Sequence, residues 1–427
     1  MEELTKEQIE QMSSRELLDY YLSKAYEDAR NAHKNGKLVC WSTSIAPAEF
    51  CETMDVCLVY PENHAAAIGA KKGALDMIDY AEGLGYNTDI CSYARVNIAY
   101  MELLLEEART GKTPEVLANC PAERIPLPDF ILVCNNICNT LLKWYENIAV
   151  ELGIPYIIID VPYNHTMPVP QYYRDYIRSQ FGYAITQLEE ICKKPFDYEK
   201  FGRVMEQTQR SVAAWDKAMA MAEVKPSPMK GFDIFNYMAL IVCARSRKDS
   251  EIVFTKFTEE MQKKIDAGED AFKGNEKARL TWEGIACWPY LGHTFKSLKN
   301  LGINMTGSTY PGSWSMHYDP GNLDQMAVAY ATVYGNTCLD NKVKVISDVV
   351  RNAKCDGVAY HLNRSCKLMS FLNVEIAEKV SKETGTPYAS FGGDQTDPRN
   401  FSPAQFDTRM QGLAEIMAQQ KEAEQHE

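Results

Sequence analysis

Short apolar runs alternate in this chain with longer segments whose apolar residues recur at helical spacing. The first half contains apolar runs at residues 37–41, 56–60, 130–134 and 156–161, and the second half contains them at residues 280–287, 303–306, 357–361 and 388–391. This alternation is typical of parallel strands joined by crossover helices. The sequence therefore predicts an α/β fold with two Rossmann-like or flavodoxin-like domains, each with a short parallel sheet flanked by helices.

Two breaks in this pattern suggest the domain boundaries. Residues 1–35 carry apolar side chains at helical spacing and end at the breaker Asn35-Gly36, so we expect an N-terminal helical lead-in there. The proline-containing stretch 226–228 is expected to be a linker. We therefore expect a first α/β domain at residues 36–225 and a second at residues 226–427, which includes a C-terminal helix.

Charge and cysteine content narrow the class of protein. The 427 residues have a formal net charge of −13, and the acidic residues are spread along the chain, which disfavours nucleic acid and anionic membranes as partners. The apolar run at residues 154–161 is far shorter than a membrane span. With no recognisable signal peptide, a cytoplasmic location is expected, where the 13 cysteines stay reduced and some of them bind metal.

Three cysteines occupy comparable positions next to predicted strands. Cys138 follows the apolar run 130–134 and Cys366 follows the run 357–361, and each cysteine precedes a segment of helical period. Cys91 precedes another such segment, residues 93–105. Ligands of open α/β sheets gather outside the carboxyl ends of the strands. We therefore expect Cys91, Cys138 and Cys366 to converge.

Thiolates bind zinc or iron-sulfur clusters, but no C-x-x-C pair of the usual zinc or ferredoxin kind occurs in this chain. Three distant thiols around a cubane cluster would leave one iron open for a substrate. For any single cysteine the alternative is a buried, inert thiol, which is expected for Cys40, Cys57, Cys134, Cys243 and Cys287 in or beside apolar runs. For the three strand-end cysteines, the residues alone leave both interpretations open.

At these cysteines the sequence resembles a known family. The segments DICSYAR (89–95), NNICNTLLKWYE (135–146) and NRSCK (363–367) resemble the three cluster-binding motifs of the 2-hydroxyacyl-CoA dehydratase and benzoyl-CoA reductase family. The resemblance extends to WSTSIAPAE (41–49), YPENH (60–64), DQTDPR (394–399) and TR (408–409). These motifs follow one another in order, so the resemblance covers essentially residues 36–415.

The resemblance implies a [4Fe–4S] cluster held by Cys91, Cys138 and Cys366, with one open iron. Cys134 is an alternative to Cys138, although the downstream lysine-aromatic-glutamate pattern favours Cys138. Motif positions further imply that Ser44 and Glu62 bind water or the substrate hydroxyl and shuttle protons. A capping hydroxyl for Ser44 and an exposed loop carboxylate for Glu62 remain alternatives.

Other polar residues near these motifs are expected to have structural or solvated roles. His64 is expected to be a histidine of a loop or of the core with satisfied hydrogen bonds. Arg95, Lys143 and Arg364 flank the cysteine motifs and are expected to be solvated basic side chains, with stabilisation of cluster or CoA charges as the alternative.

The activity implied by the resemblance is that of one subunit of an oxygen-sensitive radical dehydratase of anaerobic fermentation. It would convert an (R)-2-hydroxyacyl-CoA into a 2-enoyl-CoA and water through a ketyl radical, with lactoyl-CoA as the first expected substrate and 2-hydroxyisocaproyl-CoA as the second. A benzoyl-CoA reductase-type subunit, a non-catalytic iron-sulfur electron-transfer subunit and a structural partner that only relays electrons are the rival interpretations.

The resemblance also implies two protein partners. One is a second, related dehydratase subunit that completes a heterodimer, and the other is a separate homodimeric iron-sulfur ATPase that activates it. No Walker-type or G-x-G-x-x-G motif occurs in the sequence, so ATP is expected to be used only by the separate activator. Whether the complex also carries FMN is left open.

Overall fold

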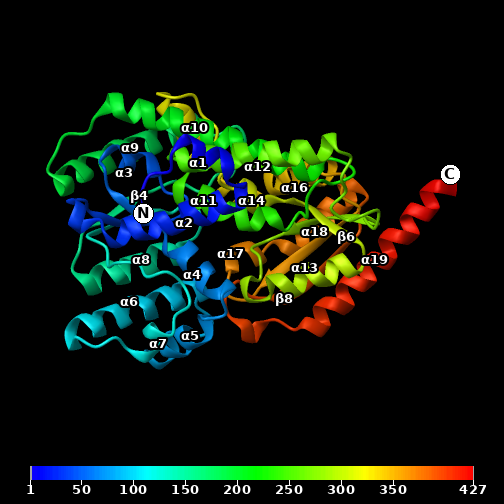
Figure 1. Cartoon of the computed structure of the whole chain (residues 1–427), viewed down its shortest axis with the longest axis horizontal. Coiled ribbons are helices and arrows are strands. Elements are labelled where there is room, and N and C mark those ends of the chain that lie inside the picture. The colour runs from blue at the N-terminus through cyan, green and yellow to red at the C-terminus, as the bar shows by residue number, and fades with distance from the viewer. Residues whose placement is uncertain (1, 427) are drawn as a thin grey trace.

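The computed structural model describes residues 2–426 and contains two four-stranded parallel sheets (Figure 1). The first sheet has the order β2-β1-β3-β4 and is formed by β1 (Val39–Ser42), β2 (Cys57–Val59), β3 (Phe130–Cys134) and β4 (Tyr156–Ile159). The second has the order β6-β5-β7-β8 and is formed by β5 (Ala278–Glu283), β6 (Ile303–Ser308), β7 (Gly357–Asn363) and β8 (Tyr388–Gly393). The predicted α/β class with two short parallel sheets is confirmed, and each apolar run overlaps one strand.

The N-terminal segment is helical, as the periodicity predicts. It forms α1 (Lys6–Gln11) and α2 (Ser14–Arg30), and each helix begins with a capping box, in which a hydroxyl and a carboxyl or amide side chain bond reciprocally to the backbone. Helix α2 packs against α11 (Asp233–Ala244) and α12 (Lys248–Asp266). The lead-in is therefore part of the packed structure.

Helices cover the faces of both sheets. The remaining helices of the first half are α3 (Ala48–Thr53), α4 (Pro61–Ala70), α5 (Ala74–Gly83), α6 (Ser92–Thr110), α7 (Glu115–Ala118), α8 (Asn139–Leu152), α9 (Gln171–Cys192) and α10 (Tyr198–Ala220). Those of the second half are α13 (Leu291–Asn300), α14 (Thr309–Gly312), α15 (Leu323–Ala331), α16 (Leu339–Asn352), α17 (Lys367–Ser370), α18 (Asn373–Thr384) and α19 (Pro403–His426). Short 3₁₀ helices are η1 (His33–Asn35), η2 (Met221–Glu223), η3 (Trp288–Tyr290), η4 (Tyr334–Asn336) and η5 (Pro398–Asn400).

The second sheet is flanked by two pairs of helices. Helix α13 packs with α19, and α16 packs with α18, while α16 and α19 each also contact β5. The far end of α19 projects beyond the sheet (Figure 1). A single hydrophobic core cluster includes side chains from both sheets, from Leu17 to Met417, so the two halves share a packed interior. Within residues 2–426, no helix has both the length and the apolar character needed to cross a lipid bilayer.

The two sheets repeat one topology. In each, the first strand lies inside the sheet, the second lies at one edge, and the third and fourth follow on the other side. The sequence Tyr60-Pro61 follows β2, and Tyr310-Pro311 follows β6 at the equivalent place. Cys138 and Cys366 likewise follow β3 and β7, the third strand of each sheet. The chain order reverses at the first strand of each sheet, and such a switch point is where open α/β sheets bind ligands.

Candidate functional site

Loops that follow strands of both sheets, together with residues of α2, α4 and α11, line one cavity of about 480 Å³. Its lining includes all five residues that the sequence singles out, namely Ser44, Glu62, Cys91, Cys138 and Cys366. Ser44 follows β1, Glu62 follows β2, Cys138 follows β3 and Cys366 follows β7. A cavity of this size is typical of small-molecule sites. The fold thus brings together residues that are up to 322 positions apart, since they run from Ser44 to Cys366.

Each of the three cysteines stands at the N-cap position of a helix. Cys91 precedes α6, Cys138 precedes α8 and Cys366 precedes the short α17. The free N–H groups and the dipole of a helix N-terminus favour negative charge, and so favour a thiolate over a thiol. Helices α6 and α8 have 19 and 14 residues, and the N-terminus of each lies at the cavity.

The three thiols also influence one another electrostatically. Burial raises the pKa of Cys91, and the charge of Cys366 raises it further. The pKa of Cys366 is raised to about 12, chiefly by burial and next by the charge of Cys138. Burial likewise raises the pKa of Cys138. These thiols are therefore protonated in a cavity without a cation, whereas a bound iron centre would favour the thiolates.

The donor set fits an iron-sulfur cluster better than a single ion. Within residues 2–426, no three His, Cys, Asp or Glu side chains come close enough together to hold one metal ion. A cluster imposes a looser requirement, because each cysteine binds a different iron and the sulfurs stay farther apart. The cavity offers three thiols from three separate helix ends, and thiols are the usual ligands of such a cluster.

Cys134 does not share this position. It is the last residue of β3, its side chain is fully buried, and it is absent from the cavity lining, which includes Cys138. Burial raises the pKa of Cys134 to about 12. Of the two cysteines that the sequence leaves as alternatives, only Cys138 faces the cavity.

Ser44 and Glu62 form a hydrogen-bonded pair at the cavity wall. The Ser44 backbone N–H donates to Glu62 Oε2 at 2.9 Å, and the Ser44 hydroxyl donates to Glu62 Oε1 at 3.0 Å. The Tyr145 hydroxyl donates to Glu62 Oε2 at 3.1 Å. Burial raises the pKa of Glu62 to about 7, although these hydrogen bonds act in the opposite direction. Glu62 is thus a buried carboxyl group that can hold or release a proton near neutral pH.

The position of Ser44 depends on two residues that sequence reasoning missed. Arg245 Nη1 donates to the Ser44 carbonyl oxygen at 2.9 Å, and Trp314 Nε1 donates to the same oxygen at 3.1 Å. The Arg245 side chain is buried, and it lies 201 positions from Ser44 along the chain. No local motif around Arg245 signals this contact, because it arises only when α11 packs against α2 and α4.

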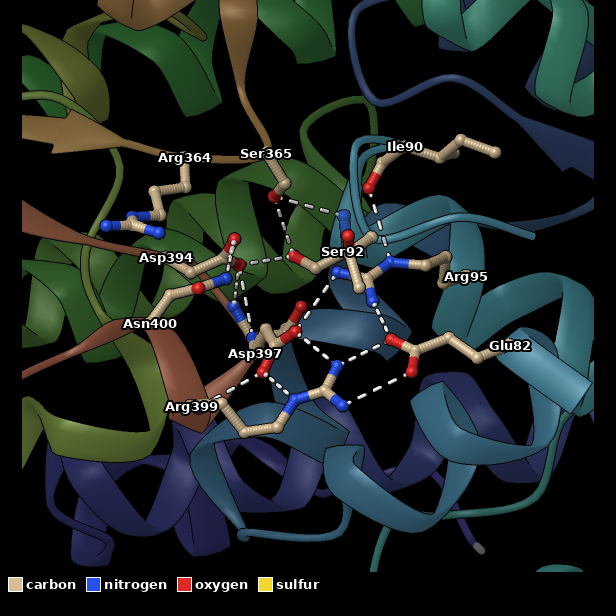
Figure 2. Close-up of polar contacts among 12 residues, drawn as sticks. Glu82, Ile90, Ser92, Arg95, Arg364, Ser365, Asp394, Asp397, Arg399 and Asn400 are labelled. Carbon is tan, nitrogen blue, oxygen red and sulfur yellow. Dashed lines mark hydrogen bonds and ion pairs between the residues drawn. The ribbon is translucent and has the colours of Figure 1, made fainter.

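The segment after β8 joins the Cys91 and Cys366 loops (Figure 2). The Ser92 hydroxyl donates to Asp394 Oδ1 at 2.6 Å, and the Ser92 backbone N–H donates to Ser365 Oγ at 3.1 Å. Both serines are buried and each is adjacent to one of the cysteines. The conformations of two cysteine loops from different halves are therefore coupled by direct hydrogen bonds.

The flanking polar residues behave as expected in three of four cases. His64 is buried with Nε2 at 2.8 Å from the Glu123 carbonyl oxygen, and burial lowers its pKa to about 4, so it is a core histidine as predicted. Lys143 and Arg364 are exposed, as predicted. The prediction of a solvated Arg95 is wrong, because its guanidinium is completely buried.

Arg95 forms a buried ionic cluster between the two halves. Its Nη1 atom lies 2.7 Å from Glu82 Oε1, and its Nη2 atom lies 3.2 Å from Asp397 Oδ2 (Figure 2). Arg399 contacts the same two acids. The Asp397 side chain is only 2% exposed, so solvent screens the Arg95 contact weakly.

Replacing Arg95 by methionine should destabilise the protein strongly. The variant leaves the buried Asp397 carboxylate without one of its two arginines, and breaking a buried pair costs about 3–5 kcal/mol. The matched control is Lys143→Met, since Lys143 is 76% exposed and its pair with Glu146 contributes about 0–1 kcal/mol. Chemical denaturation of both variants measures the difference, and equal free energies of unfolding would contradict the structural role of Arg95.

Comparison with known proteins adds independent information. A family model described as "2-hydroxyglutaryl-CoA dehydratase, D-component" matches residues 43–417. The chain is 59% identical over 408 residues to the lactoyl-CoA dehydratase subunit alpha of Anaerotignum propionicum. The matched region covers 95% of this chain and 97% of that protein.

Two further relatives match over nearly their whole lengths. The (R)-2-hydroxyisocaproyl-CoA dehydratase alpha subunit of Clostridioides difficile is 45% identical, over 96% of this chain and 98% of that protein. The (R)-phenyllactyl-CoA dehydratase alpha subunit of Clostridium sporogenes is 44% identical, over 93% of each chain. All three relatives are named as alpha subunits of dehydratases that act on CoA thioesters.

Proposed function

Because this chain belongs to the family described as 2-hydroxyglutaryl-CoA dehydratase, D-component, we propose that it acts on lactoyl-CoA and forms acryloyl-CoA and water. The chain is an alpha-type subunit of the 2-hydroxyacyl-CoA dehydratase family, and its activity is that of a hydro-lyase. The proposal of lactoyl-CoA is supported by the 59% identity to a lactoyl-CoA dehydratase subunit. The observation that carries the assignment of the site is that one cavity is lined by Ser44, Glu62 and all three helix N-cap cysteines.

The cofactor in this proposal is a [4Fe–4S] cluster held by Cys91, Cys138 and Cys366. When bound, it would supply a low-potential electron and an open iron that acts as a Lewis acid. The protein contributes three thiols around one cavity and two helix N-termini that stabilise negative charge. The radical route through a ketyl form of the substrate is part of the same proposal.

Glu62 and Ser44 handle protons in the proposed reaction. The substrate loses a hydroxyl from the α carbon and a proton from the β carbon, and the two leave together as water. Glu62 in its acid form protonates the departing hydroxyl, which leaves as water. The resulting carboxylate then accepts the proton from the β carbon of the substrate. The Ser44 hydroxyl and the Tyr145 hydroxyl hold the two carboxyl oxygens in place.

The proposal requires two partners. The relatives are named as alpha subunits, which implies a beta subunit beside this chain. The activator is proposed to be a separate homodimeric iron-sulfur ATPase, since the sequence has no phosphate-binding glycine motif of its own. The electron that the activator supplies returns to the cluster after each turnover. ATP hydrolysis is therefore needed to start the cycle, but ATP is not consumed in every turnover.

An anaerobic reconstitution tests the proposed substrate. The chain, its beta subunit and the activator are combined with ATP and a reductant, and the products from lactoyl-CoA, 2-hydroxyisocaproyl-CoA and benzoyl-CoA are separated. We expect acryloyl-CoA to form from lactoyl-CoA with the highest kcat/KM and without net use of reductant. A dearomatised product from benzoyl-CoA, with stoichiometric electron use, would instead indicate a reductase. Absence of any turnover would favour an electron-transfer subunit.

A further inference from the structure

A buried amide points at one of the three thiols. Gln395 follows β8, is 1% exposed and lines the same cavity. Its Nε2 atom donates a hydrogen bond to Cys91 Sγ at 3.2 Å. We propose that Gln395 is a positioning residue that raises the reduction potential of the cluster through this hydrogen bond. The inference rests on the proposed function, because it requires Cys91 to be a cluster ligand.

The orientation of the Gln395 amide is fixed by its neighbours. Asn363 Nδ2 donates to Gln395 Oε1, so the other end of the Gln395 amide, which carries the N–H groups, faces the sulfur. Asn363 is 1% exposed, and its Oδ1 atom accepts a hydrogen bond from the Cys366 backbone N–H at 3.3 Å. The Trp288 backbone N–H donates to the Gln395 carbonyl oxygen at 3.1 Å. A continuous chain of hydrogen bonds thus runs from the backbone of Cys366 to the sulfur of Cys91.

This arrangement has an electrostatic consequence. Reduction adds negative charge to a cluster, and part of that charge resides on the ligating sulfurs. A hydrogen-bond donor aimed at such a sulfur stabilises the reduced state more than the oxidised state, and so raises the reduction potential. The effect is strong in a buried site, because little solvent screens the N–H dipole. The Gln395 amide is neutral, so it has this effect without adding a net charge to the cavity.

Two substitutions at Gln395 separate the hydrogen bond from simple packing. Gln395→Met keeps the length of the side chain and removes the donor. Gln395→Glu keeps the acceptor for Asn363 and places a second oxygen against Cys91 Sγ. The matched control is Gln207→Met, because Gln207 is also a buried amide that donates to two side chains, and it lies on α10 outside the cavity lining.

The measurement is an anaerobic redox titration of the complex between this chain and its beta subunit, reconstituted without the iron-sulfur activator. The reduced cluster is detected by electron paramagnetic resonance, with viologens as redox mediators. One electron enters the cluster from the poised mediator, and no bond forms or breaks. We expect Gln395→Met to shift the one-electron equilibrium about tenfold toward the oxidised state, which lowers the midpoint potential by about 59 mV. Gln395→Glu should lower it further, and Gln207→Met should leave it unchanged.

Iron and acid-labile sulfide analysis distinguishes failure of this inference from failure of the proposed function. An unchanged potential in both Gln395 variants, with normal iron content, would overturn the role of Gln395 and leave the cluster assignment intact. Loss of iron without any change in the potential of the remaining cluster would show a structural role only, and would also overturn it. A wild-type complex without iron-sulfur content would instead reject the proposed function.

Discussion

Replacing Cys138 by alanine is expected to abolish both cluster binding and dehydration. Cys138 lines the cavity at the N-cap of α8, and its thiol contributes to the raised pKa of Cys366, so it is one of three neighbouring ligands in the proposed site. Two remaining thiols cannot hold three corners of a cluster. We expect turnover to fall by more than the ~100-fold that loss of an outer-shell partner costs.

The control for this experiment lies four residues away. Cys134 is fully buried in β3 and does not line the cavity, so Cys134→Ala should keep a normal iron content and normal turnover. Iron and sulfide quantification under anaerobic conditions, together with the dehydration assay, compares the two variants. Iron loss in Cys134→Ala with retention in Cys138→Ala would reverse the assignment between the two cysteines.

Glu62→Gln is expected to lower kcat by about 10²–10⁴-fold, the usual contribution of an acid-base group. The substitution keeps the shape of the side chain and its contact with Ser44, but removes the group whose pKa burial raises to about 7. The KM for the acyl-CoA should change little, because the amide still occupies the cavity wall. Unchanged turnover in the assembled complex would exclude Glu62 from proton transfer and remove this chain from the substrate site.

Glu283→Gln is the matched control for Glu62→Gln. Glu283 ends β5, is completely buried, accepts a hydrogen bond from Thr309, and also has a pKa raised to about 7 by burial, but it lies outside the cavity lining. We therefore expect Glu283→Gln to retain turnover. Retained activity here, with lost activity in Glu62→Gln, would separate catalysis from the general effect of removing a buried acid.

Glu62→Gln and Glu283→Gln should both weaken the pH dependence of the free energy of unfolding. A folded-state pKa of about 7, against an ordinary value of 4.5, means that the folded protein holds a proton which unfolding releases. The stability from each carboxyl is fully present below about pH 4.5 and is lost as the pH rises through about 7. The loss is roughly 3 kcal/mol per group. Denaturation of cluster-free protein at about pH 5 and about pH 8 should show a weaker pH dependence in each variant than in the wild type.

Five of the eight strands, β1, β3, β5, β6 and β7, are predictable because nearly all their residues are buried on both faces, which leaves a largely apolar run in the sequence. Residues 130–134 were expected to form a strand, and β3 spans Phe130–Cys134. The prediction for residues 280–287 was too long, because β5 ends at Glu283 and Gly284 has a φ of 105°. The residues after Gly284 are apolar and buried without belonging to the sheet. The domain boundary at residue 226 stays a prediction.

The site was predictable only where local sequence determines position. Cys138 and Cys366 follow strands, and that placement alone sets them at the edge where parallel strands end. Arg245 and Gln395 escaped prediction because their contacts with Ser44 and Cys91 join residues 201 and 304 positions apart. Arg95 was misjudged for the same reason, since its partner Asp397 lies 302 positions away.

The hydrogen bonds between the Cys91 loop and the segment after β8 constrain when the site can form during biosynthesis. A ribosome that has released the whole first sheet has delivered Cys91 and Cys138, but neither Cys366 nor Gln395. The Ser92 hydroxyl and the Arg95 guanidinium have no Asp394 or Asp397 to contact until residue 397 emerges from the exit tunnel. The pocket is therefore completed only after Cys366 and the segment that follows β8 have been synthesised, so a prosthetic group that needs all three cysteines cannot be fully bound before that point.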